Sequence, residues 1–595
     1  MTKQNFLILL LSIALSFGIF GNGIRGEFTY DDTPIIATSQ DIKDPRNLFK
    51  LFVSPYYFQQ PEIGLYRPLP KATYLLNYSL FGSSPISFHV VNILLHAISC
   101  FLVFMLIKFL TSNSKIAFFS FLLFLTHPIH TEAVTLIVGR AEILAFFFSI
   151  LMIYLHLTRK FMWANICFLL ALFSKEIAAT TLPLLFYIDW VKNKKFPKIK
   201  QYLYYASPLA IYLLLRYATL GKYIFHSQAL DYVENPLPFV GLPEKIFTTL
   251  KVLYLYFEKL IYPGYLTNDY SVNVIKLVSN PIYSIESILG IIILIFLILL
   301  PLHPRTRSTA FGLGAAIFLL PYLLISNFIL TVGTIMGERL IYFSSLGFIL
   351  ILAYLLYLLS QKHKVWPEVP WIILTIIVVL FSARTIIRNE DWINNDRLYT
   401  VNLKNHPEGF LTQLYWGTSL VSKNITEAKK HLALAQKIYP NNPRLLITFG
   451  TLAEEERRDA EAEMYYKLAI KNNALAIEAY ARLGYLYFIE QKYSESAQNF
   501  EKSLNIFPDS YAASYYARAE IQLGTPDKGI NLIRKYFGDN PNDVGLISAL
   551  GYSYYIKRDY KNALIYLNKS KELGNINQEI ASMIETSNKM LSQHQ

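Results

Sequence analysis

Charged residues are scarce in this chain of 595 residues: they make up 16% of it, against 53% hydrophobic and 15% aromatic residues. So low a charged fraction excludes a string of soluble domains and indicates a polytopic membrane protein. Cysteine is almost absent, since only Cys100 and Cys167 occur and both lie in apolar runs. Two such thiols exclude a disulfide framework. A Walker phosphate-binding loop and a kinase signature are also missing, so ATP-driven transport is not expected.

The net charge of +13 could suggest nucleic-acid binding, but the placement of the basic residues argues against it. Through the first 390 residues, Lys and Arg form short clusters between apolar runs, which is the pattern of cytoplasmic loops. Residues 5–20 are long enough to span a membrane, and no clear small-residue cleavage site follows them. We therefore expect a retained first span and no nucleic-acid partner.

About eleven apolar segments are candidates for membrane spans, two of them short for the roughly 20 residues that a span requires. Basic clusters fall on alternate sides of these segments, which predicts a cytoplasmic N-terminus and an outer C-terminus. Counting residues 246–263 as a further span would break this alternation, so we expect an interfacial or re-entrant helix there. The expected spans are residues 4–21, 89–110, 115–134, 139–158, 161–174, 176–191, 201–219, 284–302, 309–330, 339–360 and 370–387.

The first outer loop, residues 22–88, is long, mixed in charge and rich in proline and aromatic residues. Such a loop is expected to carry short helices that lie along the membrane. Asp31 and Asp32 lie near its start. Either of them could instead have a structural role and cap a short helix that begins near Pro34. If Asp32 caps that turn, Asp31 is the better candidate for a base.

Further ionisable residues fall at the same predicted membrane face, in the links between spans. Charges at span ends are costly and therefore indicate function. Arg140, Lys175 and Arg339 could together neutralise a phosphate. The alternative is a structural network of ion pairs, for instance Arg140 with Glu132 or Glu142.

Two motifs could indicate a metal site and a dinucleotide site, but neither interpretation is favoured. His127 and His130, with Glu132 beside them, could converge on a divalent metal. Mutual hydrogen bonding around Pro128 is the simpler expectation, and a metal is not favoured. Residues 21–26 match a glycine-rich dinucleotide motif, but a membrane helix precedes them and the required strand is lacking.

From about residue 400 the composition changes to that of a soluble helical protein, and a repeat appears. Small residues recur at steps of 34, 34, 33 and 34 residues, at Ala428, Ala462, Ser496, Gly529 and Ala563. This is the tetratricopeptide period, and about five repeats would stack into a solenoid with a concave surface for a peptide or protein. An ordinary helical bundle is the alternative, which a sustained period disfavours.

Several separate motifs of the membrane half, together with the repeat tail, resemble the transmembrane and tetratricopeptide-repeat O-mannosyltransferases and their bacterial relatives. That family belongs to the GT-C superfamily of membrane glycosyltransferases. The motifs occur in the same order along the chain. They are Phe28-Thr29-Tyr30-Asp31-Asp32, Tyr66-Arg67-Pro68-Leu69, Phe88-His89-Val90-Val91-Asn92, His127-Pro128-Ile129-His130-Thr131-Glu132, Gly139-Arg140-Ala141-Glu142, Asn268-Asp269-Tyr270-Ser271 and Glu338-Arg339-Leu340-Ile341-Tyr342.

The resemblance implies transfer of a sugar from a polyprenyl-phosphate carrier to an acceptor hydroxyl on a protein or envelope glycan, outside the cytoplasm. Mannose is implied by the resemblance alone. Asp31 or Asp32 is implied as the general base, with Arg140, Lys175 and Arg339 on the phosphate side. No cofactor is implied, because the lipid-linked sugar is a substrate. The residues expected to shape the site are Arg67, His127, His130, Glu132, Glu338, Tyr342 and Asp269.

We therefore expect an all-α chain: a GT-C transmembrane domain over residues 1–390, a linker over 391–408 and a tetratricopeptide domain over 409–595. The bacterial inner membrane, with the repeats in the periplasm, is the expected location, and the endoplasmic reticulum membrane is the alternative. A non-enzymatic membrane-anchored scaffold for envelope assembly is the competing function. A transporter of lipid-linked sugars ranks last, because it should need polar residues at mid-membrane instead of at one face.

Overall fold

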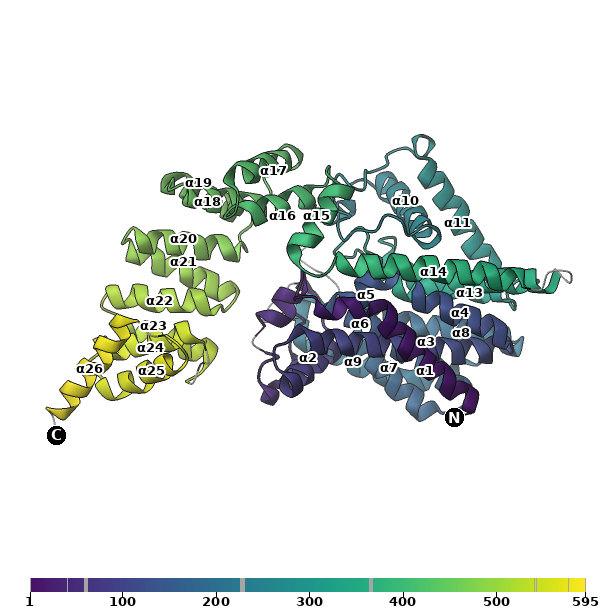
Figure 1. The fold of residues 1–595 in the computed structure, drawn as a ribbon, viewed down its shortest axis with the longest axis horizontal. Helices are drawn as coiled ribbons and strands as arrows, with labels where there is room; N and C mark the ends of the chain where they lie inside the picture. The colour runs from purple at the N-terminus through teal and green to yellow at the C-terminus, as the bar shows by residue number, and fades with distance from the viewer. Residues whose placement is uncertain are drawn as a thin grey trace. The chain divides into compact units, whose positions relative to one another are not determined.

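The computed structural model describes residues 2–39, 41–57, 63–224, 231–362, 368–539, 541, 543–575 and 577–593. Within these ranges the chain is helical and forms no β-strand beyond one isolated bridge, between Val272 and Ile275. The all-α prediction is confirmed. The chain divides into two compact units, Met1–Gln413 and Leu414–Gln595 (Figure 1).

Each predicted span of the first unit contains a helix. Six of the described helices are long and apolar enough to cross a membrane, namely α1, α3, α6, α11, α13 and α14. The remaining predicted spans contain the shorter helices α4, α7, α8, α9 and α12, so the number of eleven spans stays a prediction. The helices are α1 (Lys3–Phe20), α2 (Pro68–Phe81), α3 (Pro85–Thr111), α4 (Ser114–Thr126), α5 (Thr131–Thr135), α6 (Arg140–Leu157), α7 (Phe161–Ser174), α8 (Thr181–Asn193), α9 (Ala206–Leu220), α10 (Leu242–Ile261), α11 (Ile285–Leu302), α12 (Ala310–Ile325), α13 (Tyr342–Lys362), α14 (Val369–Glu390) and α15 (Asn395–Asn405).

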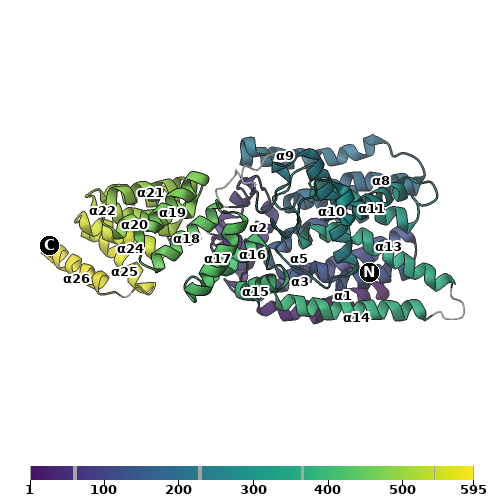
Figure 2. The same cartoon turned by 90° about the horizontal axis from the view of Figure 1, so that it is seen from above.

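Small residues allow the apolar helices of this unit to pack closely. A Cβ atom on Gly347 of α13 would lie 2.3 Å from the carbonyl oxygen of Gly314 in α12, so only glycine fits there. Where α1 packs on α3, the Ser12 hydroxyl donates to the carbonyl of Ala97 at 2.6 Å. Helix α1 also packs against α14, as Figure 2 shows. Close approach and interhelical hydrogen bonds are the usual means by which helices associate in a membrane.

The third predicted span, residues 115–134, is wrong as a single helix. Helix α4 ends at Thr126 and His127 has an extended backbone, with ψ of 123°. Proline disfavours helical geometry in the residue before it, so Pro128 ends the helix here. The chain then continues through a short turn into α5 and a second turn over Ile137–Gly139. These turns form one wall of the candidate site.

The loop of residues 22–88 carries short helices, as expected, and packs into a hydrophobic core. Its buried residues Ile35, Leu51 and Tyr74 pack with Ile137 of the α5–α6 connection and with Leu398 of α15. A buried ion pair joins Lys71 of α2 to Asp41. Residue 40 and residues 58–62 of this loop lie outside the described residues.

The C-terminal part of the first unit continues past the last apolar helix. Residues 391–408, expected as a linker, hold α15, whose Leu398 is fully buried. Asn402 of α15 donates to Asn268 at 2.6 Å and so holds the loop of residues 264–275. Residues 246–263 fall on α10, which packs tightly on α11: a Cβ on Gly290 would meet the Leu250 carbonyl at 2.0 Å.

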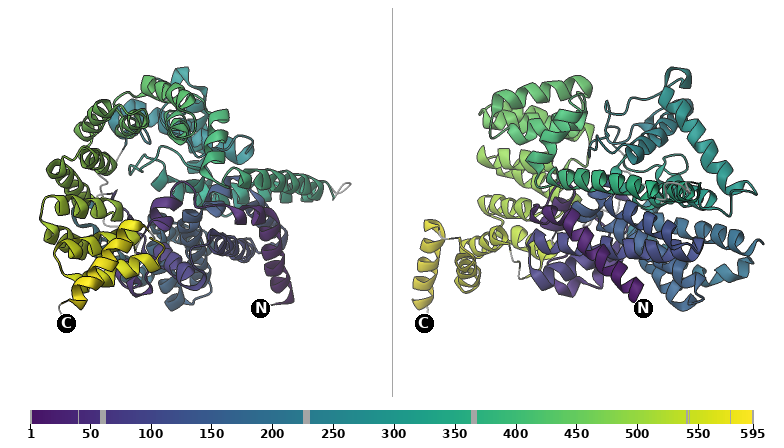
Figure 3. Two further views of the ribbon diagram at one scale, coloured as in Figure 1. Left: turned by 60° about the vertical axis from the view of Figure 1, so that its left-hand side comes forward. Right: turned by 45° about the vertical axis from the view of Figure 1, so that its right-hand side comes forward.

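The second unit is a row of helix–turn–helix pairs with the predicted period, followed by α26 (Figure 3, left). Gly484 of α20 faces Phe500 of α21, and the Ser496 hydroxyl donates to the Gly484 carbonyl at 2.8 Å, so small residues set the helix spacing. Gly551 faces Leu567 in the same way. The helices are α16 (Phe410–Leu420), α17 (Ile425–Ile438), α18 (Pro443–Glu455), α19 (Asp459–Asn472), α20 (Ile477–Ile489), α21 (Tyr493–Ile506), α22 (Ser510–Gln522), α23 (Pro526–Phe537), α24 (Val544–Ile556), α25 (Tyr560–Glu572) and α26 (Gln578–Ser592).

Candidate active site

Asp31 and Arg339, which are 308 residues apart in the chain, form an ion pair with 2.7 Å between Oδ2 and Nη2. Arg339 lies in the turn Glu338–Ile341 that leads into α13. Its backbone N–H donates to the Glu132 carboxylate at 2.9 Å, and its Nε lies 3.6 Å from the same group. Arg339 therefore bridges two carboxylates. Both side chains of the Asp31–Arg339 pair are 25% exposed, so solutes can reach them.

A second ion pair joins Lys175 to Glu142 and is almost completely buried. Lys175 directly follows α7, and Glu142 lies in the first turn of α6, where the helix dipole favours a carboxylate. Burial lowers the pKa of the Lys175 ammonium, although Glu142 favours the charged form. Lys175 and Glu142 thus form a buried ion pair held at the ends of α7 and α6.

A third group of charges consists of Glu176, Arg67 and Arg216, and the sequence did not point to Arg216. Glu176 accepts from Arg67 at 3.1 Å and from Arg216 at 3.3 Å, and Arg67 also lies over the ring of Tyr56. The two guanidinium groups offset the cost of burying the Glu176 carboxylate. Arg216 lies in α9, within a predicted span, and a charge in such a segment was the signal that could have found it.

The three groups of charges belong to one electrostatic network. The charges of Asp31, Arg67 and Arg339 all act on the buried hydroxyls of Tyr56 and Tyr57, and burial raises the pKa of Tyr56 to about 12. The network joins segments that lie far apart in the sequence. It offers partly exposed carboxylate and guanidinium groups in direct contact, and the charge of Arg339 also acts on the buried Lys175 ammonium.

Asp32 has different surroundings from Asp31, and Tyr30, before the pair, adopts a left-handed backbone with φ of 49°. The Asp32 carboxylate is fully buried and accepts from the backbone N–H of Val138 at 2.8 Å and of Ile137 at 3.3 Å. Burial raises its pKa to about 7, against the effect of these hydrogen bonds. The cap interpretation is wrong, since no side-chain bond caps the turn Thr33–Ala37. Asp32 instead ties the first loop to the α5–α6 connection.

Arg140 is buried among neutral partners. It donates to the side-chain oxygens of Asn92 and Asn77, each at 2.7 Å, and to the Phe88 carbonyl at 3.0 Å. It also lies over the ring of Tyr74. The suggested ion pairs with Glu132 or Glu142 are wrong, since Arg140 forms no ion pair within the described part of the chain. Its contacts fix α2 and α3 to α6.

The expected mutual hydrogen bonding of His127, His130 and Glu132 is wrong, because each of them bonds to other residues. His130 contacts the Phe124 carbonyl and the Ser345 hydroxyl, both at 2.8 Å, and His127 contacts the Leu260 carbonyl at 3.0 Å. The Tyr342 hydroxyl lies 2.7 Å from His96. Among the described residues, no group of three His, Cys, Asp or Glu side chains could hold a metal ion.

Glu338 belongs to the turn that carries Arg339, and Asp269 lies in the loop whose Thr267 N–H donates to Glu338. Glu338 is fully buried, accepts from Tyr270 at 2.9 Å and lies 3.5 Å from Arg388, another buried charge missing from the sequence expectations. Asp269 accepts from the Thr412 hydroxyl at 2.7 Å. The sequence could have pointed to Arg388, because a charged residue within a long apolar helix indicates function.

Comparisons with known proteins agree with the motifs, although no family model matches the chain. It is 25% identical over 583 residues to protein O-mannosyl-transferase TMTC3 of Homo sapiens, covering 88% of this chain and 63% of that protein. It is 26% identical over 452 residues to protein O-mannosyl-transferase F38B6.6 of Caenorhabditis elegans, covering 74% and 64%. The chain thus spans less than two thirds of these relatives' length.

Solved structures show weaker likeness. The Pseudomonas aeruginosa pilF structure has a TM-score of 0.29 at 16% identity and covers 32% of this chain and 87% of its own. The Cut9–Hcn1 hetero-tetramer structure has a TM-score of 0.31 at 12% identity, with coverage of 87% and 93%. Scores of this size establish no common fold. In sequence, the chain is similar over most of its length to animal proteins named as protein O-mannosyl-transferases.

Proposed function

We propose that this protein is an integral membrane glycosyltransferase of the GT-C type that uses a polyprenyl-phosphate-linked sugar as donor. The acceptor is a hydroxyl group on a protein or an envelope glycan. The observation that carries the proposal is the contact of Asp31 with Arg339, in one network with Glu142 and Lys175. A carboxylate in contact with a guanidinium supports the assignment of a base beside a phosphate ligand, which the transfer requires. The names of the relatives favour mannose as the sugar and protein as the acceptor.

Asp31 is the base in this proposal and Asp32 is its support. A base must come within hydrogen-bond reach of the acceptor hydroxyl, and only Asp31 is partly exposed, because Asp32 is fully buried among backbone N–H groups. Asp31 takes the hydroxyl proton while the acceptor oxygen forms its bond to the anomeric carbon. The bond from that carbon to the phosphate oxygen breaks, and the electron pair leaves with the lipid phosphate.

Arg339 and Lys175 are the cations that face the leaving phosphate in this scheme. Each now pairs with a carboxylate, so the site is electrically compensated before the donor binds. A donor phosphate competes with Asp31 for Arg339, and its binding would free the Asp31 carboxylate to accept a proton. Arg67 and Arg216 hold Glu176 at the edge of the network. Arg140 acts as a support, because its donors are engaged by neutral oxygens.

The proposal places the site and the repeat unit at the outer face of a membrane. The basic clusters between spans support this orientation. The bacterial inner membrane, with the repeats in the periplasm, is the proposed location. The endoplasmic reticulum membrane is the alternative.

Transfer assays on the purified protein in lipid nanodiscs test the function. The donor is radiolabelled polyprenyl-phosphate mannose, and the acceptor is a serine- and threonine-rich peptide. Asp31→Asn is expected to reduce transfer by about a hundredfold or more, and Arg339→Gln by a similar factor. Asp44→Asn changes an exposed carboxylate of the same loop and should transfer like the wild type.

Retention of the fold is checked on each variant by size-exclusion elution and thermal melting. If Asp31→Asn transfers sugar at the wild-type rate, the assignment of the base is wrong. If the wild-type protein transfers no sugar from polyprenyl-phosphate donors to peptide or glycan, the scaffold function takes its place.

A further inference from the structure

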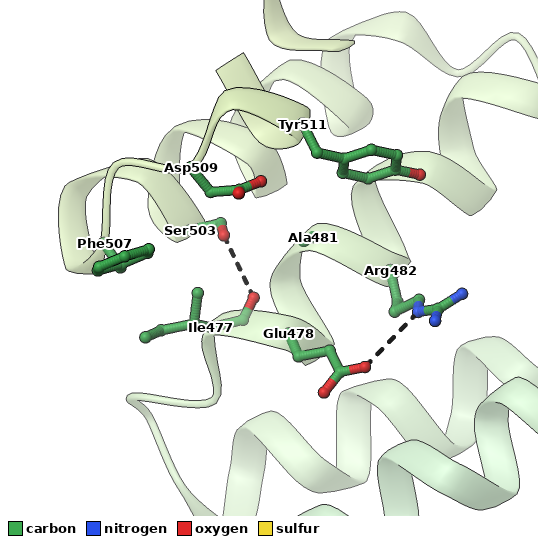
Figure 4. Close-up of a pocket in the computed structure, with 8 residues that line it drawn as sticks. All are labelled: Ile477, Glu478, Ala481, Arg482, Ser503, Phe507, Asp509 and Tyr511. Atoms are coloured by element: carbon green, nitrogen blue, oxygen red, sulfur yellow. Dashed lines mark hydrogen bonds and ion pairs between the residues drawn. The ribbon is translucent and has the colours of Figure 1, made fainter. Parts of the chain in front are cut away.

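The second unit contains a cavity of about 500 Å³ between α20, the end of α21 and the start of α22 (Figure 4). Its apolar part consists of Ile477 and Ala481 on α20, Phe507 after α21, and Tyr511 on α22. A volume of this size is typical of sites that take a small ligand or a ligand side chain. The cavity is therefore large enough for a leucine or an aromatic ring.

The cavity is a product of the repeat geometry. Ile477 and Ala481 lie four residues apart and so share one face of α20. The Ser503 hydroxyl donates to the Ile477 carbonyl at 3.2 Å, which fixes the end of α21 against the start of α20. Asp509 caps α22 by accepting from the Ala512 N–H at 2.9 Å, so its carboxylate is engaged.

Arg482 lies at the rim and is weakly held. Its guanidinium lies 3.8 Å from Glu478 and 3.6 Å from Glu454, and its side chain is 39% exposed. Long, exposed ion pairs of this kind contribute little, since solvent screens them. Arg482 can therefore exchange these partners for a ligand group at low cost.

A row of aromatic rings leads from the cavity to a second arginine. The ring of Tyr511 contacts that of Tyr515 at 4.8 Å between centroids, and the Arg518 guanidinium lies 5.3 Å from the Tyr515 centroid. Arg518 is half-buried and forms no ion pair with any described residue. A partly desolvated guanidinium without a carboxylate is an open position for an anion.

The repeat places these groups at equivalent positions of neighbouring first helices. Gly484, Ala517 and Gly551 each lie against the second helix of their own repeat. The residues that directly follow them are Tyr485, Arg518 and Tyr552, so an arginine stands between two tyrosines in the series. Burial raises the pKa of the Tyr552 hydroxyl, and the charge of nearby Arg518 opposes this rise. The cation thus belongs to a row of tyrosines on the first helices, the elements from which solenoids build extended binding surfaces.

We propose that this cavity and the adjoining tyrosine–arginine row bind an extended polypeptide segment. An apolar side chain of the segment fills the cavity, and a carboxylate side chain on the same side of the extended chain pairs with Arg518. Alternate side chains of an extended peptide share one side, so the apolar and the acidic side chain can both face the row that runs from Tyr511 through Tyr515 to Arg518. That this polypeptide is the glycosyl acceptor rests on the proposed transferase function, whereas binding itself does not.

Fluorescence anisotropy on the full-length protein in nanodiscs tests the proposal. The probe is a short fluorescein-labelled glycine–serine peptide with a central Leu and a Glu two positions later. A matched peptide carries Lys in place of Glu, and a fluorescein-labelled mannose oligosaccharide represents a glycan ligand. The wild type is expected to bind the Glu peptide at least about tenfold more tightly than the Lys peptide.

Two variants separate the cavity from the cation. Arg518→Gln should remove the preference for Glu over Lys, and Ala481→Trp should weaken binding of both peptides about tenfold or more by filling the cavity. Lys561→Gln changes an exposed cation on α25 and should bind like the wild type. Binding of the Glu peptide that survives both site variants overturns the proposal, as does tighter binding of the mannose oligosaccharide than of either peptide.

The Asp31→Asn variant keeps the two proposals apart. It should bind the Glu peptide like the wild type, because Asp31 belongs to the first unit and the cavity to the second. Peptide binding in a protein without transferase activity would refute the proposed function and leave the peptide site intact. Transfer activity without peptide binding would refute the site alone.

Discussion

Adjacent residues of one type have opposite roles in this protein because their surroundings differ. Asp31 is a quarter exposed and contacts a guanidinium, whereas Asp32 is fully buried and accepts from backbone N–H groups. Burial without a cationic partner favours the neutral acid. The pair therefore separates into an exposed carboxylate able to react and a buried one that joins the first loop to the α5–α6 connection.

The buried Asp32 predicts a pH dependence of stability. Its pKa is raised from 3.8 to about 7, so the folded state holds a proton that the unfolded state has lost between these values. The contribution of Asp32 to stability is therefore complete below about pH 4 and is lost as the pH rises to about 7. The apparent melting temperature of the wild type in detergent should fall by a few degrees across this range, relative to that of Asp32→Asn.

The amide in Asp32→Asn cannot titrate, so only the difference between the two melting curves is informative. Asp44→Asn, which changes an exposed loop carboxylate, should follow the wild type. A difference between the wild type and Asp32→Asn that stays constant across the range would show that Asp32 is ionised in the folded protein at low pH.

At the scale of the elements, helix ends and helix spacing set the site. Pro128 ends α4 early, and the turns that follow deliver Glu132 and the N–H groups that Asp32 accepts. The turn before α13 delivers Arg339. Since α13 is held against α12 at Gly314 and Gly347, the spacing of these two helices also positions that turn.

Gly347→Leu is expected to destabilise the protein more than a Gly→Leu change at a glycine with open space around it. A side chain at residue 347 would meet the backbone of α12 within 2.4 Å and force the helices apart. Overpacking of this kind typically costs about 1–3 kcal/mol or more, so the melting temperature in detergent should drop clearly. Gly18→Leu on α1 is the matched control, because nothing lies within 4 Å of a Cβ at that position. Equal melting temperatures for the two variants would show that α12 and α13 are not in close contact.

At the scale of the whole molecule, the chain forms two compact units. We propose that the candidate site and the repeats both lie at the outer face of the membrane. Unit Met1–Gln413 carries the apolar helices and the charge network, and unit Leu414–Gln595 carries the repeats. The orientation rests on the basic clusters between spans. It is open to direct measurement.

Accessible cysteines test that orientation. In a background without Cys100 and Cys167, a cysteine replacing the exposed Lys561 should react with a membrane-impermeant maleimide from outside intact cells. A cysteine replacing the exposed Lys195, in the basic cluster after α8, should react only after permeabilisation. The reverse labelling pattern would invert the topology, and labelling of neither from outside would place the repeats in the cytoplasm.

The sequence could predict the helical class, the position of each apolar helix and the repeat period. These properties depend on local composition and spacing, which the chain order displays directly. It also pointed to Asp31, Lys175 and Arg339, because ionisable groups at the ends of apolar segments stand out.

Only the tertiary structure decided which of these charges meet. Asp31 and Arg339 pair across 308 residues, and no local pattern encodes such a contact. In the sequence, Arg140 and Arg339 are equivalent candidates for a phosphate ligand. Arg140, however, contacts the amide oxygens of Asn77 and Asn92, because α2 and α3 pack on α6. The sequence by itself determined the elements and the chemical groups, whereas packing of distant segments determined which group is exposed, which is buried and which faces an opposite charge.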